Sequence, residues 1–240
     1  RFARVHQDLP APRLDDVAGR INEQLAEPEF ADTVKPGQRI GITVGSRGIA
    51  NMPLIVRTLA DWVKSKGASA VIIPAMGSHG GATADGQRQM LLGMGFTPET
   101  SGCEIISSLD VTELGEVDGL KVLFSSDALA CDGLILCNRI KAHTDIVGPI
   151  ESGLMKMAAI GVGKHRGALQ AHSRGLHMAG KMIQTIAPLE RAVKFTKLFT
   201  CGFSMSPSEL RLIAMALEIA WAALSSLLAC WRMLLRDTMA

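Results

Sequence analysis

The sequence predicts an α/β fold, with a mainly parallel β-sheet flanked by helices, from three observations. Short apolar runs alternate with segments of helical periodicity, which is typical of βαβ units. Several of these runs are apolar throughout, as in strands that a parallel sheet buries on both faces. Glycine-rich turns follow the first two runs, where strands of such a sheet lead into their helices. Together these features indicate a Rossmann-like arrangement.

The first strand–helix–strand unit is defined by its end signals. The apolar run Arg39–Val44 is predicted to be a strand that ends at the glycine-rich turn 45–48. A helix begins near Pro53, because proline is favoured in a first turn, and it ends before Gly67. Residues 68–74 are predicted to form the second strand.

The remaining elements complete one α/β domain over residues 1–197. An amphipathic helix is expected near residues 14–25, before the first strand. Thr83 is a suitable N-cap for a helix that runs to about Leu92. Further strands are predicted at residues 104–107, 121–124 and Gly133–Cys137.

Residues 198–240 differ from the rest and are predicted to form an apolar helical tail. Residues 212–231 carry one charge, Glu218, and their length is sufficient to span a bilayer. Three interpretations stay open: a helix that is buried or meets a partner, a truncation or frame error in the sequence, and a membrane helix. The membrane interpretation is the weakest, because the segment has a central Glu and follows an α/β domain.

Composition excludes several classes of function. The net charge is +2, and no basic run is interleaved with aromatic residues, so we expect no nucleic-acid partner. The five cysteines form no C-x-x-C pair and no zinc spacing, which favours a reducing, cytoplasmic location. The N-terminus has no apolar signal segment and no starting methionine, so we expect a fragment.

Two histidines follow predicted strands and are candidate proton carriers. His79 lies in a glycine-rich turn, and an imidazole takes and returns protons near neutral pH. His143 follows the strand Gly133–Cys137. Two histidines from different strand ends can reach a substrate from opposite faces, as interconversion of mirror images requires. The alternative for His79 is a loop histidine that bonds only to the main chain.

Three further residues are candidates for binding. Arg47 offers a guanidinium fork to a carboxylate or phosphate, and its alternative is a surface ion pair. Lys156 is either a lysine at a helix edge or an amine that attaches covalently to a cofactor. His172 belongs to a group of three histidines from which a metal ligand can come, since imidazole suits Zn, Cu, Fe and Ni. By contrast, residues 164–166 are expected to be a solvated basic turn.

The order of these residues resembles the N-terminal domain of the nickel-pincer-nucleotide-dependent lactate racemase family. That family has an Arg in an early strand-end loop, a Gly-x-His-x-x-x-Thr element, a later Pro-His, a lysine in a Ser-Gly-containing turn, and a histidine sixteen residues beyond it. The resemblance covers roughly residues 10 to 195, and the interval from the lysine to the last histidine is its most specific element. The matching residues here are Arg47, Gly77-Ser78-His79 with Thr83, Ala142-His143, Ser152-Gly153 with Lys156, and His172.

The resemblance implies an isomerase, a racemase or epimerase of a small 2-hydroxy acid. Lys156 would hold pyridinium-3,5-bisthiocarboxylic acid mononucleotide as a thioamide, and His172 would complete the coordination of nickel. His79 and His143 would be the paired acid/base groups, and Arg47 would also bind the substrate. Accessory cofactor-biosynthesis proteins would be required. The residues implied around the cofactor are Lys156, Ser46, Arg47 and Thr83.

Some features depart from the family pattern and keep an alternative open. Ala142 stands where the family has proline, and Leu154-Met155 stand where it has glycine before the lysine. Nothing after about Phe195 resembles the family's second domain. The alternative is therefore a catalytically incomplete fragment, or a binding module for a phosphate or carboxylate ligand. A dinucleotide-dependent oxidoreductase is less favoured, because no G-x-G-x-x-G follows a strand.

Overall fold

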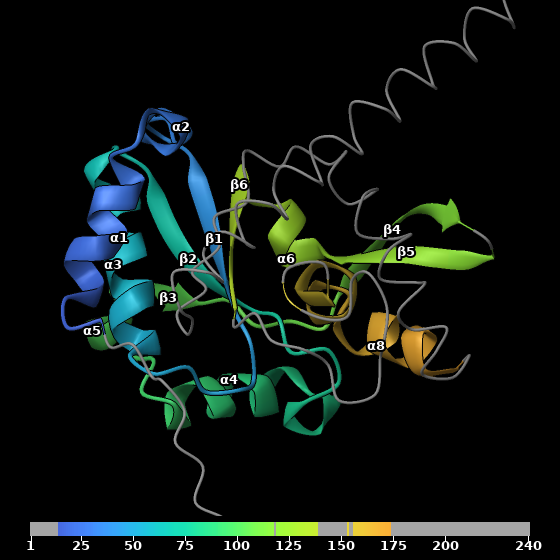
Figure 1. The fold of residues 1–240 in the computed structure, drawn as a ribbon. Coiled ribbons are helices and arrows are strands. Elements are labelled where there is room, and N and C mark those ends of the chain that lie inside the picture. The colour runs from blue at the N-terminus through green and yellow to red at the C-terminus, as the bar shows by residue number, and fades with distance from the viewer. Residues whose placement is uncertain (1–13, 118, 139–152, 154–155, 174–240) are drawn as a thin grey trace, which may run out of the picture. The chain divides into compact units, whose positions relative to one another are not determined.

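A four-stranded parallel sheet forms the centre of the fold and confirms the predicted α/β class (Figure 1). The computed structural model describes residues 14–117, 119–138, 153 and 156–173. The strand order is β3-β2-β1-β6. The bounds are Arg39–Val44 for β1, Ser69–Pro74 for β2, Glu104–Ile105 for β3 and Gly133–Cys137 for β6.

Helices begin and end close to where the sequence signals place them. The helix expected near residues 14–25 is α1, Val17–Leu25, which begins after Asp16 because that carboxylate accepts a hydrogen bond from Gly19 N at 2.7 Å. The helix that ends before Gly67 is α3, and the helix capped by Thr83 is α4. The other helical bounds are Met52–Ser65 for α3, Ala84–Gly93 for α4, Pro28–Ala31 for α2, Pro98–Ser101 for α5, Ser126–Leu129 for α6, Lys164–Ser173 for α8, Gly80–Ala82 for the 3₁₀ turn η1 and Met157–Val162 for the π-helix η2.

The strand predicted at residues 121–124 exists, but it belongs to a separate antiparallel hairpin. It is β5, Leu120–Ser125, and it pairs with β4, Val111–Val117. The sequence pattern did not predict β4, because its apolar residues are separated from one another by pairs of Thr, Glu and Gly residues and form neither a continuous run nor an alternation. Glu113 on β4 forms an ion pair with Lys121 on β5 at 2.8 Å, so charged side chains support this pairing.

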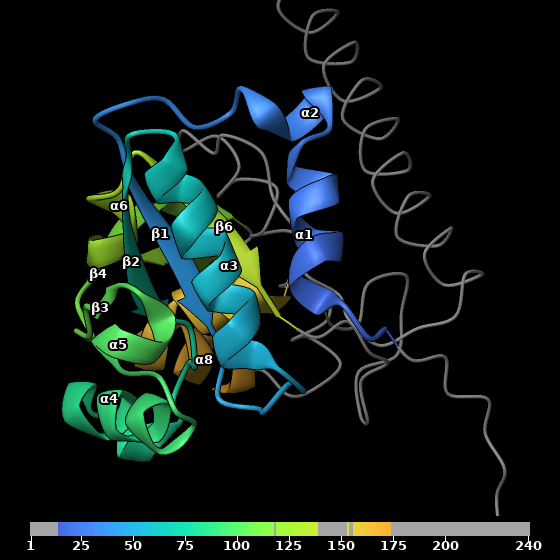
Figure 2. The ribbon, with the colours of Figure 1, turned by 90° about the vertical axis from the view of Figure 1, so that its left-hand side faces the viewer.

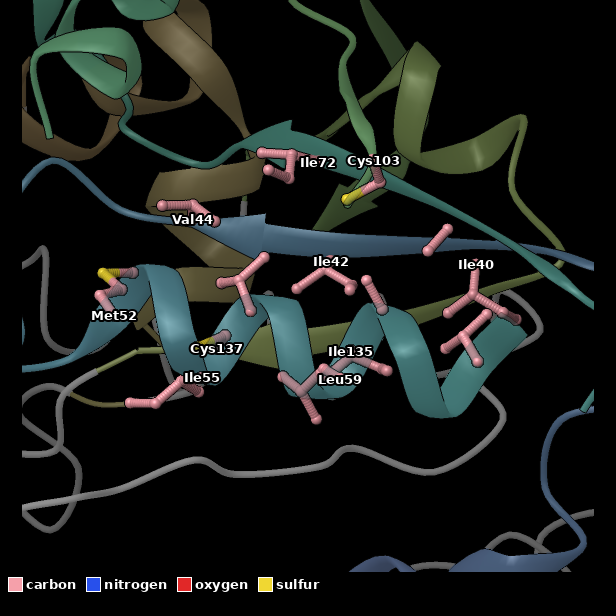
Figure 3. Close-up of a cluster of buried hydrophobic side chains, with 14 of the residues drawn as sticks. Ile40, Ile42, Val44, Met52, Ile55, Leu59, Ile72, Cys103, Ile135 and Cys137 are labelled. Atoms are coloured by element: carbon pink, nitrogen blue, oxygen red, sulfur yellow. The ribbon is translucent and has the colours of Figure 1, made fainter. Parts of the chain in front are cut away.

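Both faces of the parallel sheet are covered. On one face α1 and α3 pack against the sheet (Figures 1 and 2), and Ile42, Ile55 and Leu59 are completely buried between them (Figure 3). On the other face, side chains of β2 and β6 meet β5 and η2 in a second apolar cluster. Each fully buried Ile or Leu contributes about 1.5–3 kcal/mol relative to an exposed one. Burial on both faces explains why the strands are apolar throughout.

The strand order places a switch point at β1. Strands β2 and β6 lie on opposite sides of β1, and Val44 at the end of β1 pairs with both Pro74 and Cys137. In open α/β sheets, ligands bind beyond the carboxyl ends of the strands at such a point. The turn 45–48 and the segment after β2 both begin there.

The predicted tail, residues 198–240, lies outside the described residues, as does the boundary expected at residue 197. Among the residues that the structure describes, no helix has both the length and the apolar character needed to cross a membrane.

Replacing Gly80 by alanine tests the contact between η1 and α4. Gly80 has φ +67°, and a Cβ there would lie 2.6 Å from the backbone nitrogen of Gln87. We expect Gly80→Ala to lower the free energy of unfolding by about 2 kcal/mol or more. Gly93→Ala is the control, because a Cβ at this helical position meets nothing within 4 Å, and it should be neutral or stabilise by up to about 1 kcal/mol. Equal urea midpoints for the two variants would contradict this account.

Candidate active site

The turns that follow β1 and β2 bring Ser46 and His79 into contact. Because the two strands are parallel neighbours, their carboxyl ends lie side by side and both turns leave the sheet at the same edge. Ser46 Oγ and His79 Nδ1 form a hydrogen bond between these turns. Two residues 33 positions apart in the chain, both predicted as site residues, therefore meet.

The surroundings of His79 favour a neutral imidazole. Partial burial is the largest cause that lowers its pKa below the ordinary value of 6.5, followed by the positive charges of Arg47 and then Lys156. The structure thus brings Arg47 and Lys156 within electrostatic range of the same ring. A neutral imidazole that remains accessible to solvent can accept a proton near pH 7.

Ser46 leaves His79 free to use either neutral tautomer. A hydroxyl both donates and accepts hydrogen bonds, so Ser46 can donate to a bare Nδ1 or accept from a protonated one. When Ser46 accepts, Nε2 carries no proton and can act as a base. When Ser46 donates, Nε2 carries the proton and can donate a hydrogen bond; an imidazole that has taken up a second proton donates from Nδ1 to Ser46 and can act as an acid through Nε2. A carboxylate in this place would instead favour the charged imidazolium and raise the pKa.

Lys156 reaches the site because the π-helix η2 packs against the end of β2. Gly77 N donates to Gly161 O at 3.3 Å, and a Cβ on Gly161 would lie 2.8 Å from Ala75 O. Lys156 directly precedes η2, so this contact fixes its backbone near the His79 turn. Single π-turns are rare and occur frequently at functional sites.

His172 lies one helical turn beyond a residue that touches the His79 turn. A Cβ on Gly77 would meet the Cβ of Ala168 in α8 at 3.3 Å. His172 follows Ala168 by four residues and therefore shares its side of the helix. Its side chain is exposed, and within the described part of the chain no hydrogen bond joins it to Ser46 or His79.

The hydroxyl of Thr83 is engaged in capping, as the sequence predicted. Thr83 Oγ1 accepts from Gly86 N at 3.0 Å and donates to Gly80 O at 3.2 Å. The hydroxyl retains one acceptor position for a ligand. His143, the second proposed acid/base group, lies outside the described residues.

The prediction of a solvated basic turn at residues 164–166 was wrong for Lys164. This side chain is completely buried, and its Nζ donates to Pro74 O, at the end of β2, at 2.7 Å. Burial lowers the pKa of the amine from 10.5 to about 8, while the charge of Asp127 acts in the opposite direction. Of the other two residues, Arg166 is exposed and His165 is half-buried.

The physical reason for the burial of Lys164 lies in the junction of two helices. Lys164 has φ +57°, a left-handed conformation, where η2 ends and α8 begins. The sequence contained one signal for this burial, the run of small and apolar residues before Lys164. A lysine that directly follows a buried apolar run can itself be buried. Gln87, on α4, is a second buried polar residue that sequence reasoning missed.

Comparison with protein-family models, with curated proteins and with solved structures gives no match for this chain.

Lys164 should make stability rise with pH in the alkaline range. Between pH 8 and 10.5 the folded chain has released the proton that the unfolded chain still holds, so unfolding takes up a proton. The stability is therefore greatest above pH 10.5 and is lost as the pH falls through the folded pKa of about 8. The full difference is on the order of 3 kcal/mol.

Urea denaturation of the parent and of Lys164→Met, from pH 7 to 10.5, measures this contribution. The free energy of unfolding of the parent, relative to the variant, should increase across the window. In the control Lys35→Met, at an exposed position, the free energy of unfolding should increase with pH as it does in the parent. A difference between parent and Lys164→Met that does not change with pH would contradict the burial of a titrating amine.

Removing Arg47 should raise the pKa of His79, because one of the positive charges that oppose protonation is lost. Titration of the imidazole Cε1 proton by NMR measures this, with the His79 signal assigned by its absence in His79→Asn. Arg20→Ala, at an exposed ion pair with Glu23 on α1, is the control and should leave the pKa unchanged. An unchanged pKa in Arg47→Ala would show that the two side chains do not interact.

Proposed function

We propose that this chain is the cofactor-bearing half of a racemase or epimerase that acts on a small 2-hydroxy acid with a nickel-pincer nucleotide. The single observation that supports it best is the grouping around His79. Its imidazole is held by Ser46 and lies in the field of Arg47 and Lys156. This grouping supplies a proton carrier, the guanidinium of Arg47 and the amine of Lys156 at the carboxyl end of a parallel sheet; once Lys156 carries the cofactor, Arg47 is the remaining positive charge of the group.

An anionic substrate is the natural ligand of such a site. Arg47 attracts the carboxylate and can bind it through two parallel hydrogen bonds. The same carboxylate would then place its neighbouring hydroxyl group toward His79. His79 Nε2 takes the hydroxyl proton when Nδ1 donates to Ser46, and the proton stays on this nitrogen until the hydroxyl is formed again.

The hydroxyl of Ser46 suits a reaction that runs in both directions. A racemase must remove a proton from one enantiomer and return a proton when that enantiomer is the product. Ser46 can accept a hydrogen bond from Nδ1 both when Nε2 is bare and acts as a base and when Nε2 carries the transferred proton and acts as an acid, so one hydrogen bond serves both directions. In this proposal His143 performs the same exchange for the opposite enantiomer.

Two residues would hold the cofactor that the resemblance implies: Lys156, directly before η2, and His172, on α8. In the described residues, no group of three or more His, Cys, Asp and Glu is close enough to hold a metal ion. A pincer nucleotide supplies several metal ligands itself, so one histidine from the protein suffices, and His172 would provide it. Lys156 would hold the nucleotide covalently. When bound, this group supplies the acceptor for the hydride on the carbon that carries the hydroxyl.

A binding module for a phosphate or carboxylate is the second candidate. It is favoured by one observation, the two cationic side chains next to glycine-rich turns, since these bind an anion without any chemistry. This candidate predicts neither a covalent adduct on Lys156 nor bound nickel. The two functions can therefore be distinguished by measuring the covalent adduct and the bound nickel.

Intact-mass spectrometry with nickel analysis tests the proposal. The chain is produced together with the proteins that make the pincer nucleotide, beside Lys156→Arg, which keeps the charge but cannot form the thioamide. We expect a mass adduct and stoichiometric nickel in the parent and no covalent adduct in the variant. Lys35→Arg is the matched control and should carry the adduct.

Absence of both adduct and nickel from folded parent protein would reject the racemase and favour the anion-binding module. Binding of lactate or phosphate to the same protein, measured by calorimetry with Arg47→Ala as control, would then establish that second function.

If the chain turns over a 2-hydroxy acid, the acid limb of its kcat/KM profile should lie below pH 6.5. His79 must be neutral to accept a proton, and its surroundings lower its pKa from that value. Arg47→Lys keeps a positive charge and should keep the position of this limb, although it binds a carboxylate less well. An acid limb above pH 6.5 would exclude His79 as the base.

A further inference from the structure

A buried glutamine lies directly beneath the turn that carries His79. Gln87 on α4 is completely buried. Its Nε2 donates to Gly77 O at 2.9 Å and to His79 O at 3.3 Å, so both amide protons are used on the same turn. The assignment of nitrogen and oxygen is fixed by chemistry, because an amide oxygen in this position would face two carbonyl oxygens.

Close packing of main chain on main chain lets Gln87 reach this turn. Gly80 lies against the first turn of α4, since a Cβ on Gly80 would be 2.6 Å from Gln87 N. A Cβ on Gly86 would be 1.9 Å from Gly80 O. Because these two glycines have no side chains, the two backbone segments lie in direct contact. The Gln87 amide therefore lies within hydrogen-bonding distance of the carbonyls on both sides of Ser78.

Three different elements then hold the His79 turn. The main chain is held by Gln87 from α4 and by the bond from Gly77 N to Gly161 O of η2. The ring is held by Ser46, which follows β1. If the backbone is free to move, the bond to Ser46 alone cannot fix the ring, because a single hydrogen bond allows both the loop and the side chain to rotate.

We propose that Gln87 is a positioning residue for His79. It fixes the backbone on each side of the turn so that the imidazole stays on Ser46 and within the field of Arg47 and Lys156. Gln87 is fully buried and both of its donor bonds go to the His79 turn, so it acts through His79. The role in turnover rests on the proposed function, whereas the effect on the imidazole does not depend on it.

The test compares Gln87→Met with Gln89→Met. Methionine has a similar length and no donor, so Gln87→Met removes both hydrogen bonds while it fills the space. Gln89 is exposed on the same helix and is the matched control. Removal of the donor should release the ring from its partly buried position and from Arg47, so the pKa of His79 should rise toward its ordinary value. The control should keep the pKa of the parent.

The kinetic arm applies if the parent proves to be a racemase. There we expect kcat of Gln87→Met to fall on the order of tenfold to a hundredfold with little change in KM, since misplacement of a reacting group costs rate. If the parent is inactive, the proposed function fails and the NMR titration still decides the role of Gln87. A folded Gln87→Met with the parent's His79 pKa would reduce Gln87 to a packing residue.

A measurement on the parent covers the case in which Gln87→Met does not fold. The Nε2 group of Gln87 bonds to the carbonyls of Gly77 and of His79 itself, so the NMR shifts of its protons should follow the titration of that imidazole. The Nε2 protons of Gln89 should not follow it. Gln87 protons that remain unaffected by the His79 titration would overturn the proposal.

Discussion

The contact between η2 and the carboxyl end of β2 is the interaction on which the candidate site depends. In this contact Gly77 N donates to Gly161 O of η2, and directly after η2 the first residue of α8, Lys164, donates from Nζ to Pro74 O, 90 positions away in the chain. Without it, Lys156 would have no fixed relation to His79. The small residues of η2 make the contact possible, because Gly161 approaches Ala75 O where any side chain would collide.

The same contact explains why a lysine is buried in this place. β2 ends inside the protein, where the carbonyl of Pro74 is buried and needs a donor, and Lys164 provides it. The cost is the removal of an amine from water, which is reflected in its lowered pKa, and the charge of Asp127 offsets part of it. Buried polar groups of this kind give a turn one position instead of several.

Glycine has two separate tasks around the site. At Gly77 and Gly80 the backbone has positive φ, which lets the chain turn sharply after β2. At Gly86 and Gly161 the missing side chain permits direct contact between backbones. The glycine-rich motif therefore positions His79 through packing within the protein.

The sequence by itself determined the parallel sheet, the starts of α3 and α4, and the presence of Ser46, Arg47 and His79 at strand ends. These follow from local signals, namely apolar runs, capping residues and glycines, which act over a few neighbouring positions. It did not determine the hairpin partner β4, the burial of Lys164 or the place of Gln87 beneath His79. Those depend on contacts between residues far apart in the chain, and only the tertiary structure decides which carbonyl a distant side chain meets. The bond between Ser46 and His79 depends on both the sequence and the tertiary structure. The local pattern placed each residue at a strand end, and the parallel pairing of β1 with β2 brought the two together.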